Sequence, residues 1–401
     1  MLDLTAQIPL KRAWDYSAPR RPSQVLPLVW GDLTSGGSGG LWSAVCLDTG
    51  SYVYALAGHP LRSLEAGNSV TLYDQDGQVI APEDYALNLA HDFQGRGAIA
   101  TATFSAEARE KEPITVRAQG RADGDGALIT NPVDIAADLL LSLAGAAAAD
   151  LEATSFSRAR ARSAALGYMA AGLLDSARSL GEALTELLSS FLGSWWQGGD
   201  GRLKVYLDLG AGSLVEGELA CSLREGDLSQ VNVAAKLSEM VNRAQVHFAY
   251  NYALDEYEAG FDGLATQDLK AQGLYGLASS TLELKWVRQA AVAATISGRL
   301  VELLGRPRRV ITCRENALCN IPLEKGDAAL LSVSWLSDQE GRPLKNQIVR
   351  VLGLEPDLDA GALNYTLLDT GFYKTKAYPA DGAALADGAC LAGGARDRAD
   401  Y

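Results

Sequence analysis

Residues 126–145, GALITNPVDIAADLLLSLAG, change from strand-like to helical sequence at a single Asn-Pro step. Asn131 can accept hydrogen bonds from the free backbone amides of a first helical turn, and Pro132 suits the first position inside a helix. Asp134 is favoured near the positive end of the helix dipole. An apolar stripe at helical spacing follows, formed by Ile135, Leu139 and Leu143. The stretch therefore predicts that a helix begins here and leaves a preceding β-rich region.

The chain before this helix has the pattern of short strands. Apolar segments such as SAVCLDTGSYVYALAG (43–58) and SVTLYDQDGQVIA (69–81) are cut at short intervals by turn-forming residues. Turn signals at this spacing are typical of a β-barrel or a β-sandwich. We expect residues 1–128 to form an N-terminal β-rich domain.

Residues 129–207 are expected to form an inserted α/β subdomain. A second helix is expected near residues 157–174, and Ser179 and Glu182 mark a third by their capping-box spacing. One apolar face of the third helix is formed by Leu184, Leu187, Leu188 and Phe191. A hairpin follows in SWWQGGDGRLKVYLDL (194–209), because its Gly and Asp residues can form a tight turn between alternating strands.

Strand-like sequence returns over residues 208–372, which we expect to form a second β-rich domain. This domain contains one helix at about residues 287–304, with apolar residues spaced for a single buried face. EPDLDAG (355–361) predicts a hairpin turn between the last two strands. The Ala/Gly-rich residues 373–401 cannot form a core alone, so we expect this C-terminal tail to dock on neighbouring chains. The expected fold class is α+β, predominantly β.

Composition and charge narrow the range of functions. The chain has 401 residues, of which 48% are apolar and 21% charged, as in ordinary globular proteins. Its formal net charge of −14 argues against a general nucleic-acid binder, because such proteins use Lys and Arg to neutralise phosphates. No apolar run reaches the roughly 18–20 residues of a membrane span, and no secretory signal is apparent. We expect a protein that stays inside the producing cell until release, without stable membrane insertion.

The sequence offers few candidates for catalysis or metal binding. His59, His91 and His247 lie in no nucleophile or metal motif, and we interpret them as structural. Five scattered cysteines indicate reduced thiols rather than a disulfide framework. Cys313 and Cys319 are the closest pair, and a zinc or iron–sulfur site there would need further ligands. We predict no enzyme activity and no cofactor, with a metal at this cysteine pair as the alternative.

An acidic run lies between residues 251 and 270, where Lys270 is the single basic residue. The run comprises Asp255, Glu256, Glu258, Asp262 and Asp268. A solvated loop is the first interpretation, and a charged lumen or a metal site are the alternatives.

The order of these segments resembles that of the baseplate hub, or tip attachment, proteins of bacteriophage tails. In that family a helix start like NPVDIAADLL (131–140) opens an inserted α/β subdomain, which runs through a capped helix to a Trp-containing hairpin like SWWQGGDGRLKV (194–205). Later matches, across about residues 25–372, are Tyr275, Gly276, Pro307, Arg308, Gly326 and Asp327.

The resemblance implies a homotrimer in which each chain contributes two barrel-like, tube-forming domains, so that six similar units match a hexameric tail tube. The chain would join that tube to the tail tip and close or gate the DNA channel. An acidic channel surface would repel DNA and ease its passage. The residues that the resemblance singles out are structural: Asn131, Pro132, Asp134, Ser179, Glu182, Trp195, Trp196, Gly326 and Asp327.

The resemblance also implies a location and a set of partners. The location is the tail tip of the virion, after assembly in the cytoplasm of the host bacterium. The partners are distal tail or tube proteins, the tape measure protein and receptor-binding or fibre proteins, with DNA only in transient passage. Longer members carry receptor-binding extensions after the core, so we expect host binding to be delegated to another protein. A β-rich module that binds or hydrolyses cell-wall carbohydrate is the alternative, motivated by Trp195, Trp196 and the acidic run.

Overall fold

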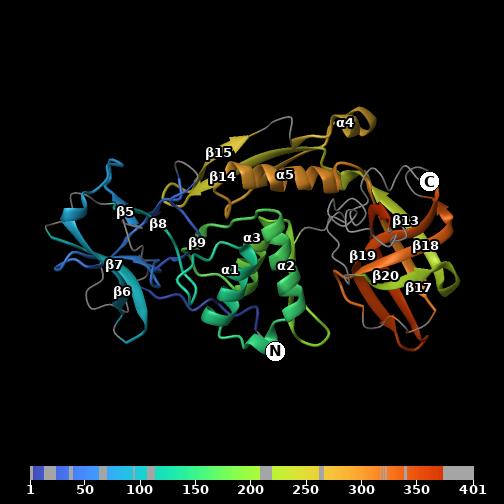
Figure 1. The fold of residues 1–401 in the computed structure, drawn as a ribbon, viewed down its shortest axis with the longest axis horizontal. Coiled ribbons are helices and arrows are strands. Elements are labelled where there is room, and N and C mark those ends of the chain that lie inside the picture. The colour runs from blue at the N-terminus through green and yellow to red at the C-terminus, as the bar shows by residue number, and fades with distance from the viewer. Residues whose placement is uncertain are drawn as a thin grey trace, which may run out of the picture. The chain divides into compact units, whose positions relative to one another are not determined.

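The computed structural model describes residues 3–12, 24–35, 39–62, 70–93, 95–105, 113–207, 219–261, 266–316, 318, 320, 323–337 and 341–373. The chain divides into two compact units. Unit 1 comprises Met1–Leu207, Gln245–Ala265 and Thr281–Ser297, and unit 2 comprises Asp208–Ala244, Thr266–Ser280 and Gly298–Tyr401. Strands dominate (Figure 1), so the predicted α+β, predominantly β class is confirmed.

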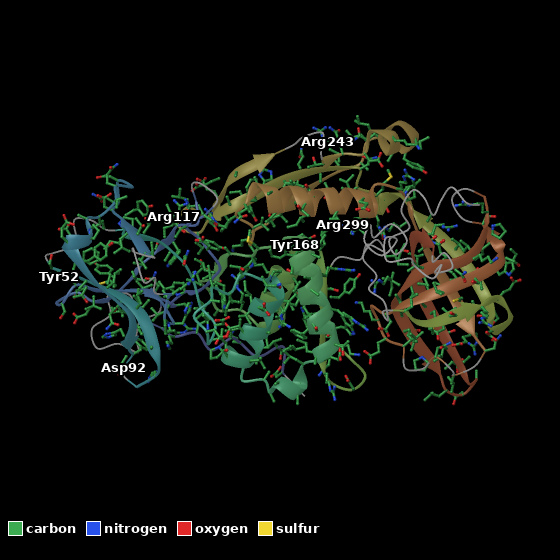
Figure 2. The ribbon with its side chains drawn as sticks, viewed as in Figure 1. Tyr52, Asp92, Arg117, Tyr168, Arg243 and Arg299 are labelled. Atoms are coloured by element: carbon green, nitrogen blue, oxygen red, sulfur yellow. The ribbon has the colours of Figure 1, made fainter. Side chains whose placement is uncertain are left out.

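The N-terminal part of unit 1 consists of short strands. They are β1 (Leu28–Trp30), β2 (Trp42–Ser43), β3 (Val45–Asp48), β4 (Val53–Ala57), β5 (Val70–Tyr73), β6 (Tyr85–Asp92), β7 (Ala98–Phe104) and β8 (Thr115–Ala118). Two antiparallel sheets result, with the orders β3-β4-β7-β6 and β2-β8-β5. Arg117 of β8, labelled in Figure 2, donates from Nε to the Leu33 carbonyl oxygen at 3.2 Å and so ties a loop to the second sheet.

The helical insert follows in unit 1. Its elements are α1 (Pro132–Asp138), a π-helical turn (Leu139–Leu143), α2 (Ala153–Ala165), β9 (Gly172–Leu174), α3 (Leu180–Ser189), β10 (Gly193–Gln197) and β11 (Leu203–Leu207). β10 and β11 form the predicted hairpin, and β9 pairs with β1, so the insert is hydrogen-bonded to the N-terminal part.

Two helices differ from their predicted bounds. α2 begins at Ala153 rather than near residue 157, because the Glu152 side chain accepts hydrogen bonds from the first free amides. It ends well before residue 174, since Gly167 adopts a positive φ of 66° just after the helix.

The later helix, α5 (Ala290–Leu304), also starts after its predicted first residue. The Val287 carbonyl oxygen accepts a hydrogen bond from the Ala249 backbone N–H at 2.9 Å. This bond holds residue 287 against the strand β14 (Arg243–Asn251) rather than in a helix. β14 is the middle strand of a small sheet, between β15 (Glu256–Phe261) and β16 (Ser279–Glu283).

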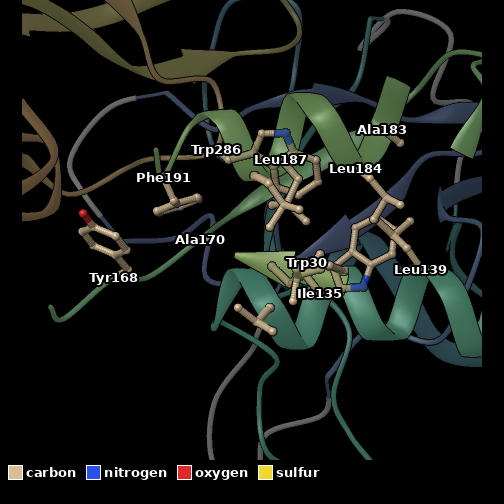
Figure 3. Close-up of a cluster of buried hydrophobic side chains, with 14 of the residues drawn as sticks. Trp30, Ile135, Leu139, Tyr168, Ala170, Ala183, Leu184, Leu187, Phe191 and Trp286 are labelled. Atoms are coloured by element: carbon tan, nitrogen blue, oxygen red, sulfur yellow. The ribbon is translucent and has the colours of Figure 1, made fainter. Parts of the chain in front are cut away.

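The largest core cluster of unit 1 combines three distant parts of the sequence (Figure 3). Trp30 comes from β1, Ile135 and Leu184 come from the insert, and Trp286 comes from the segment before α5. All four side chains are fully buried. Tyr168 packs against this cluster with its ring 5.5 Å from that of Phe191. The domain boundary predicted at residue 208 stays a prediction, although the core of unit 1 also draws on residues 246–296.

Unit 2 is built on one six-stranded sheet. Its strands are β12 (Leu219–Arg224), β13 (Leu228–Lys236), β17 (Arg308–Glu315), β18 (Ala328–Ser337), β19 (Pro343–Asp357) and β20 (Ala362–Tyr373), in the order β12-β18-β19-β20-β17-β13. The short helix α4 (Leu269–Tyr275) also belongs to this unit. The hairpin predicted around EPDLDAG is confirmed as the β19–β20 connection, with Gly361 at a φ of 64°.

The six-stranded sheet must curl. Its outer strands β12 and β13 are separated in sequence by only the turn Glu225–Asp227. A flat sheet would place them about 24 Å apart, whereas the link from Arg224 to Leu228 spans at most about 14 Å. The sheet therefore bends back on itself around a core that includes Ile311, Val333 and Leu367. Among the described residues no pairing joins β12 to β13, and a closed barrel stays a prediction.

Candidate functional site in the helical insert

The start of α1 has the predicted geometry. Asn131 is extended (φ −73°, ψ 126°), and its Oδ1 accepts a hydrogen bond from the Val133 backbone N–H at 3.0 Å. Pro132 occupies the first turn, where a backbone amide would have no partner inside the helix. The helix start is therefore fixed by local chemistry.

Two contacts join the start of α1 to α2. Asn131 Nδ2 donates to the Arg160 carbonyl oxygen at 3.3 Å, and Arg160 Nε lies 2.5 Å from Asp134 Oδ1. Both side chains of this ion pair are more than a third exposed, so its contribution to stability is small. Its role is to orient one helix against the other.

Ser179 and Glu182 form a complete capping box at α3. Ser179 Oγ accepts from the Glu182 backbone N–H at 3.2 Å, and Glu182 Oε2 accepts from the Ser179 backbone N–H at 2.8 Å. The hydrogen bond from the Ser179 backbone N–H is the main reason that the pKa of Glu182 is lowered. The carboxylate therefore stays ionised at the end of the helix where negative charge is favourable.

Trp195 and Trp196 lie on β10 and are both half-buried. Trp195 Nε1 donates to Thr185 Oγ1 of α3 at 3.0 Å, and its ring lies against Gly181, where an added Cβ would come within 3.3 Å. Trp196 is paired with Lys204 across the hairpin. Trp195 therefore joins the hairpin to α3, and the two half-buried indoles do not form the exposed aromatic platform that motivated the carbohydrate alternative.

Two tryptophans that the sequence did not single out also hold the insert. Trp30 Nε1 donates to Asp138 Oδ2 of α1 at 2.8 Å, and Trp286 Nε1 donates to Glu186 Oε1 of α3 at 3.1 Å. Arg121 lies 3.3 Å from the same Asp138 oxygen. A buried indole needs an acceptor, so each tryptophan predicts some polar partner. No local pattern identifies which helix supplies it.

The packing around Trp286 leaves no room for a larger neighbour. At Gly172 of β9, an added Cβ would lie 2.6 Å from Trp286 Cε3. Arg178 Nη1 lies 2.6 Å from Glu186 Oε2 and balances the carboxylate that accepts from the indole. The segment before α5 is thus tied to both β9 and α3.

Gly326 and Asp327 form a turn in unit 2 before β18. Gly326 has a φ of 91°, and its N–H donates to the Val351 carbonyl oxygen at 2.7 Å. Asp327 Oδ2 accepts from the Glu324 backbone N–H at 2.7 Å. Like the residues of the insert, these two fix the backbone.

The histidines are placed as follows. His59 is buried, its Nε2 accepts from the Val29 backbone N–H at 2.8 Å, and its Nδ1 lies 2.7 Å from the Pro60 carbonyl oxygen. Burial lowers the pKa of His59 to about 4, so the ring is neutral near pH 7. His247 packs with its ring 6.0 Å from that of Tyr257, and His91 belongs to β6.

Several residues of the acidic run accept hydrogen bonds from nearby groups. Asp255 and Glu258 each accept a hydrogen bond from a side chain of β14, and Asp268 caps α4 by accepting from the Ala271 backbone N–H at 2.9 Å. Asp262 lies outside the described residues. Across the part of the chain that the structure describes, no group of three or more His, Cys, Asp or Glu residues could hold a metal ion.

The structure describes one residue of the cysteine pair, Cys313. Cys313 is buried in the core of unit 2, and burial raises its pKa to about 12. A thiol in this state is a poor source of the thiolate that a metal requires. Cys319 lies outside the described residues, so a metal at this pair stays an untested alternative.

Several solved structures are similar to this chain. A tail protein from Neisseria meningitidis is 13% identical, with 76% of this chain and 84% of that chain covered at a TM-score of 0.36. The 43 kDa tail protein of prophage MuSo2 from Shewanella oneidensis is 10% identical, with 91% and 94% covered at a TM-score of 0.36. A prophage tail protein from Listeria monocytogenes is 12% identical, with 54% and 57% covered at a TM-score of 0.27.

Two of these are prophage tail proteins by name, and the third is named as a tail protein. The likeness concerns the fold alone. No protein-family model matches the sequence, and no curated protein matches it. Within the described residues, no helix is long and apolar enough to cross a membrane.

Proposed function

We propose that this chain is a structural component of a bacteriophage tail tip: a trimeric baseplate hub that joins the hexameric tail tube to the tip and closes or gates the DNA channel. The observation that carries this proposal is that three motifs of the resemblance, all in unit 1, pack together. Ile135 after the Asn-Pro step and Leu184 of the capped helix share one core, and the Trp195 indole is bonded to that same helix. In the sequence, only the order of these motifs resembles that of hub proteins. In unit 1 the three motifs contact one another.

The chemistry of these residues supports a structural role. Asn131 and Ser179 cap helices, Trp195 joins a hairpin to a helix, and Gly326 turns the backbone. Each of these contacts fixes the shape of the backbone. A site built in this way presents a rigid surface, which is what a component that aligns other subunits requires.

The charge of the chain supports passage of DNA without binding. With a formal net charge of −14, a ring of three copies would carry a strongly negative field. Phosphates in a channel lined by such copies are repelled, so DNA moves with little retention. The tube, tape measure and fibre proteins are the proposed neighbours, and the virion tail tip is the proposed location.

The native mass of the purified full chain tests the trimer. Light scattering coupled to size exclusion should give three times the mass of one chain, independent of loading concentration over a tenfold range. A mass of one or two chains contradicts the proposed hub.

The location is tested on virions. Gold-labelled antibody against this chain should mark the tail tip in negative-stain images, at the end of the tube distal to the capsid. If the label is confined to the capsid, or if virions lack this chain, the proposed location is wrong even if the purified chain is trimeric.

A further inference from the structure

A group of large apolar side chains is exposed on unit 2, on and around α4. Its members are Leu237 (60% exposed), Leu269 (61%), Leu274 (66%), Tyr275 (45%) and Leu277 (61%), and we call this group the α4 surface. Single exposed leucines are common on proteins. A concentration of them in one region is typical of an interaction site.

The α4 surface is held in place by one buried residue. Asn242 is fully buried, its Nδ2 donates to the Gly276 carbonyl oxygen at 2.7 Å, and its Oδ1 accepts from the Ala278 backbone N–H at 2.8 Å. Its own carbonyl oxygen accepts from the Asp268 backbone N–H at 2.9 Å. Asn242 thus binds the chain on both sides of α4, so the exposed leucines lie on a fixed backbone and need little ordering on binding.

Leu237 lies near the anchor of α4 in the sequence. It is five residues before Asn242, a separation of at most about 18 Å. The strand that leads to it, β13, is an outer strand of the six-stranded sheet and exposes Val233, Ala234 and Ala235.

Charge favours a second copy as the occupant. The chain carries a net charge of −14, yet residues 233–242 contain one lysine and one glutamate, and residues 266–278 contain one aspartate and one lysine. Both segments are therefore neutral. A second copy of this acidic chain meets the least repulsion here, and the exposed Lys270, next to Leu269, attracts its negative surface.

We propose that the α4 surface is a contact between copies of this chain, with a second copy as its occupant. The proposal rests on the proposed function in that it assigns residues to the self-association of the trimer. Leu269, Leu274 and Leu277 are buried in the contact, and Asn242 positions them.

The test uses the full chain and two matched triple variants. The first is Leu269→Gln, Leu274→Gln and Leu277→Gln. The control replaces three equally exposed side chains outside the α4 surface: Val79→Gln, Leu254→Gln and Leu358→Gln. Light scattering gives the native mass, and circular dichroism with thermal melting verifies that both variants fold.

We expect the native mass of the first variant to fall to that of one chain, while the control keeps the mass of the wild type. A folded first variant that retains the wild-type mass overturns the α4 surface and leaves the trimer intact. A wild type with the mass of one chain overturns the trimer together with the second copy as occupant. If the control variant dissociates as readily as the first, the contact does not depend on these leucines.

Crosslinking gives a second readout that does not require weakening the protein. Benzoylphenylalanine at position 274 should crosslink one copy to another under light, whereas the same group at position 358 should not. Equal yields at the two positions contradict the proposed contact.

Discussion

Trp30 and Trp286 lie with their ring centroids 6.2 Å apart at an interplanar angle of 45°, although they belong to widely separated parts of the sequence. Each indole N–H donates to a carboxylate on a different helix, Asp138 of α1 or Glu186 of α3. The pair therefore joins the N-terminal strands, the helical insert and the segment before α5 through one contact in a fully buried core.

Replacing Trp286 by Phe should test this contact. The variant loses the hydrogen bond to Glu186 and leaves unfilled volume, so we expect unit 1 to lose about 2 kcal/mol of stability. Urea denaturation followed by circular dichroism measures the change. Trp335→Phe is the control, because this indole is 56% exposed and its replacement should shift stability by less than about 0.5 kcal/mol. Equal effects of the two substitutions would contradict the role assigned to Trp286.

Removal of the α1 cap should have a smaller effect. Asn131→Ala leaves the Val133 amide without its side-chain acceptor, and we expect a loss of about 1 kcal/mol. Asn131→Ser keeps a capping oxygen and should retain most of the stability. A serine variant as unstable as the alanine variant would contradict the capping role of Asn131.

Acid should destabilise unit 1 through His59. The folded-state pKa is about 4 and the ordinary value is 6.5, so between these values the unfolded chain binds more protons than the folded one. The contribution to stability is complete above pH 6.5 and is lost as the pH falls toward 4, by about 3 kcal/mol in total. Unfolding midpoints measured from pH 7 to pH 4 should show this slope.

The matched variant for the pH series is His59→Gln, which does not titrate. It should be less stable than the wild type at pH 7 but should lose less stability between pH 6.5 and 4. Parallel pH profiles of the two proteins would rule out His59 as the source of the slope.

Unit 2 contains a buried network of charged and polar side chains, and the protein should lose stability when one of these side chains is shortened. Asp369 Oδ2 accepts from Arg309 Nε at 2.8 Å, and Asp369 Oδ1 accepts from Gln347 Nε2 at 2.6 Å. Asp369→Ala removes the carboxylate from a largely buried guanidinium, so we expect a loss of about 3 kcal/mol. Thermal unfolding of the full chain measures it.

The control for this network is the pair of Arg299 with Glu302, whose carboxylate side chain is half exposed. Glu302→Gln should cost less than about 1 kcal/mol. If both substitutions cost the same, burial does not determine the strength of the Asp369 contact.

The fold was predictable where local chemistry decides it. Asn131 and Ser179 cap their helices through side chains two or three residues from the amides they satisfy, so short patterns reveal both helix starts. α2 was misplaced because its cap is Glu152, a residue that seldom serves this purpose. The start of α5 was misplaced because Val287 is bonded to β14, a contact across many residues.

Long-range pairing was beyond prediction from one sequence. Nothing near Trp30 indicates Asp138 or Trp286 as its neighbours, because amphipathic patterns specify which face is buried but not what covers it. The same holds for the parallel pairing of β12 with β18, since periodicity does not encode strand order. The α4 surface was missed because exposed leucines on a short helix look like core positions in the sequence alone.

The contact between Trp30 and Trp286 has a consequence for the order in which the protein is made. Synthesis proceeds from the N-terminus, so β1 and the helical insert leave the ribosome long before residue 286 exists. Until then Gly172 and the carboxylate of Glu186 lack the indole that packs against them, and the core shared by β1 and the insert stays incomplete. The newly made N-terminal part must therefore wait, in an incomplete and aggregation-prone form, for a tryptophan translated 100 residues after Glu186.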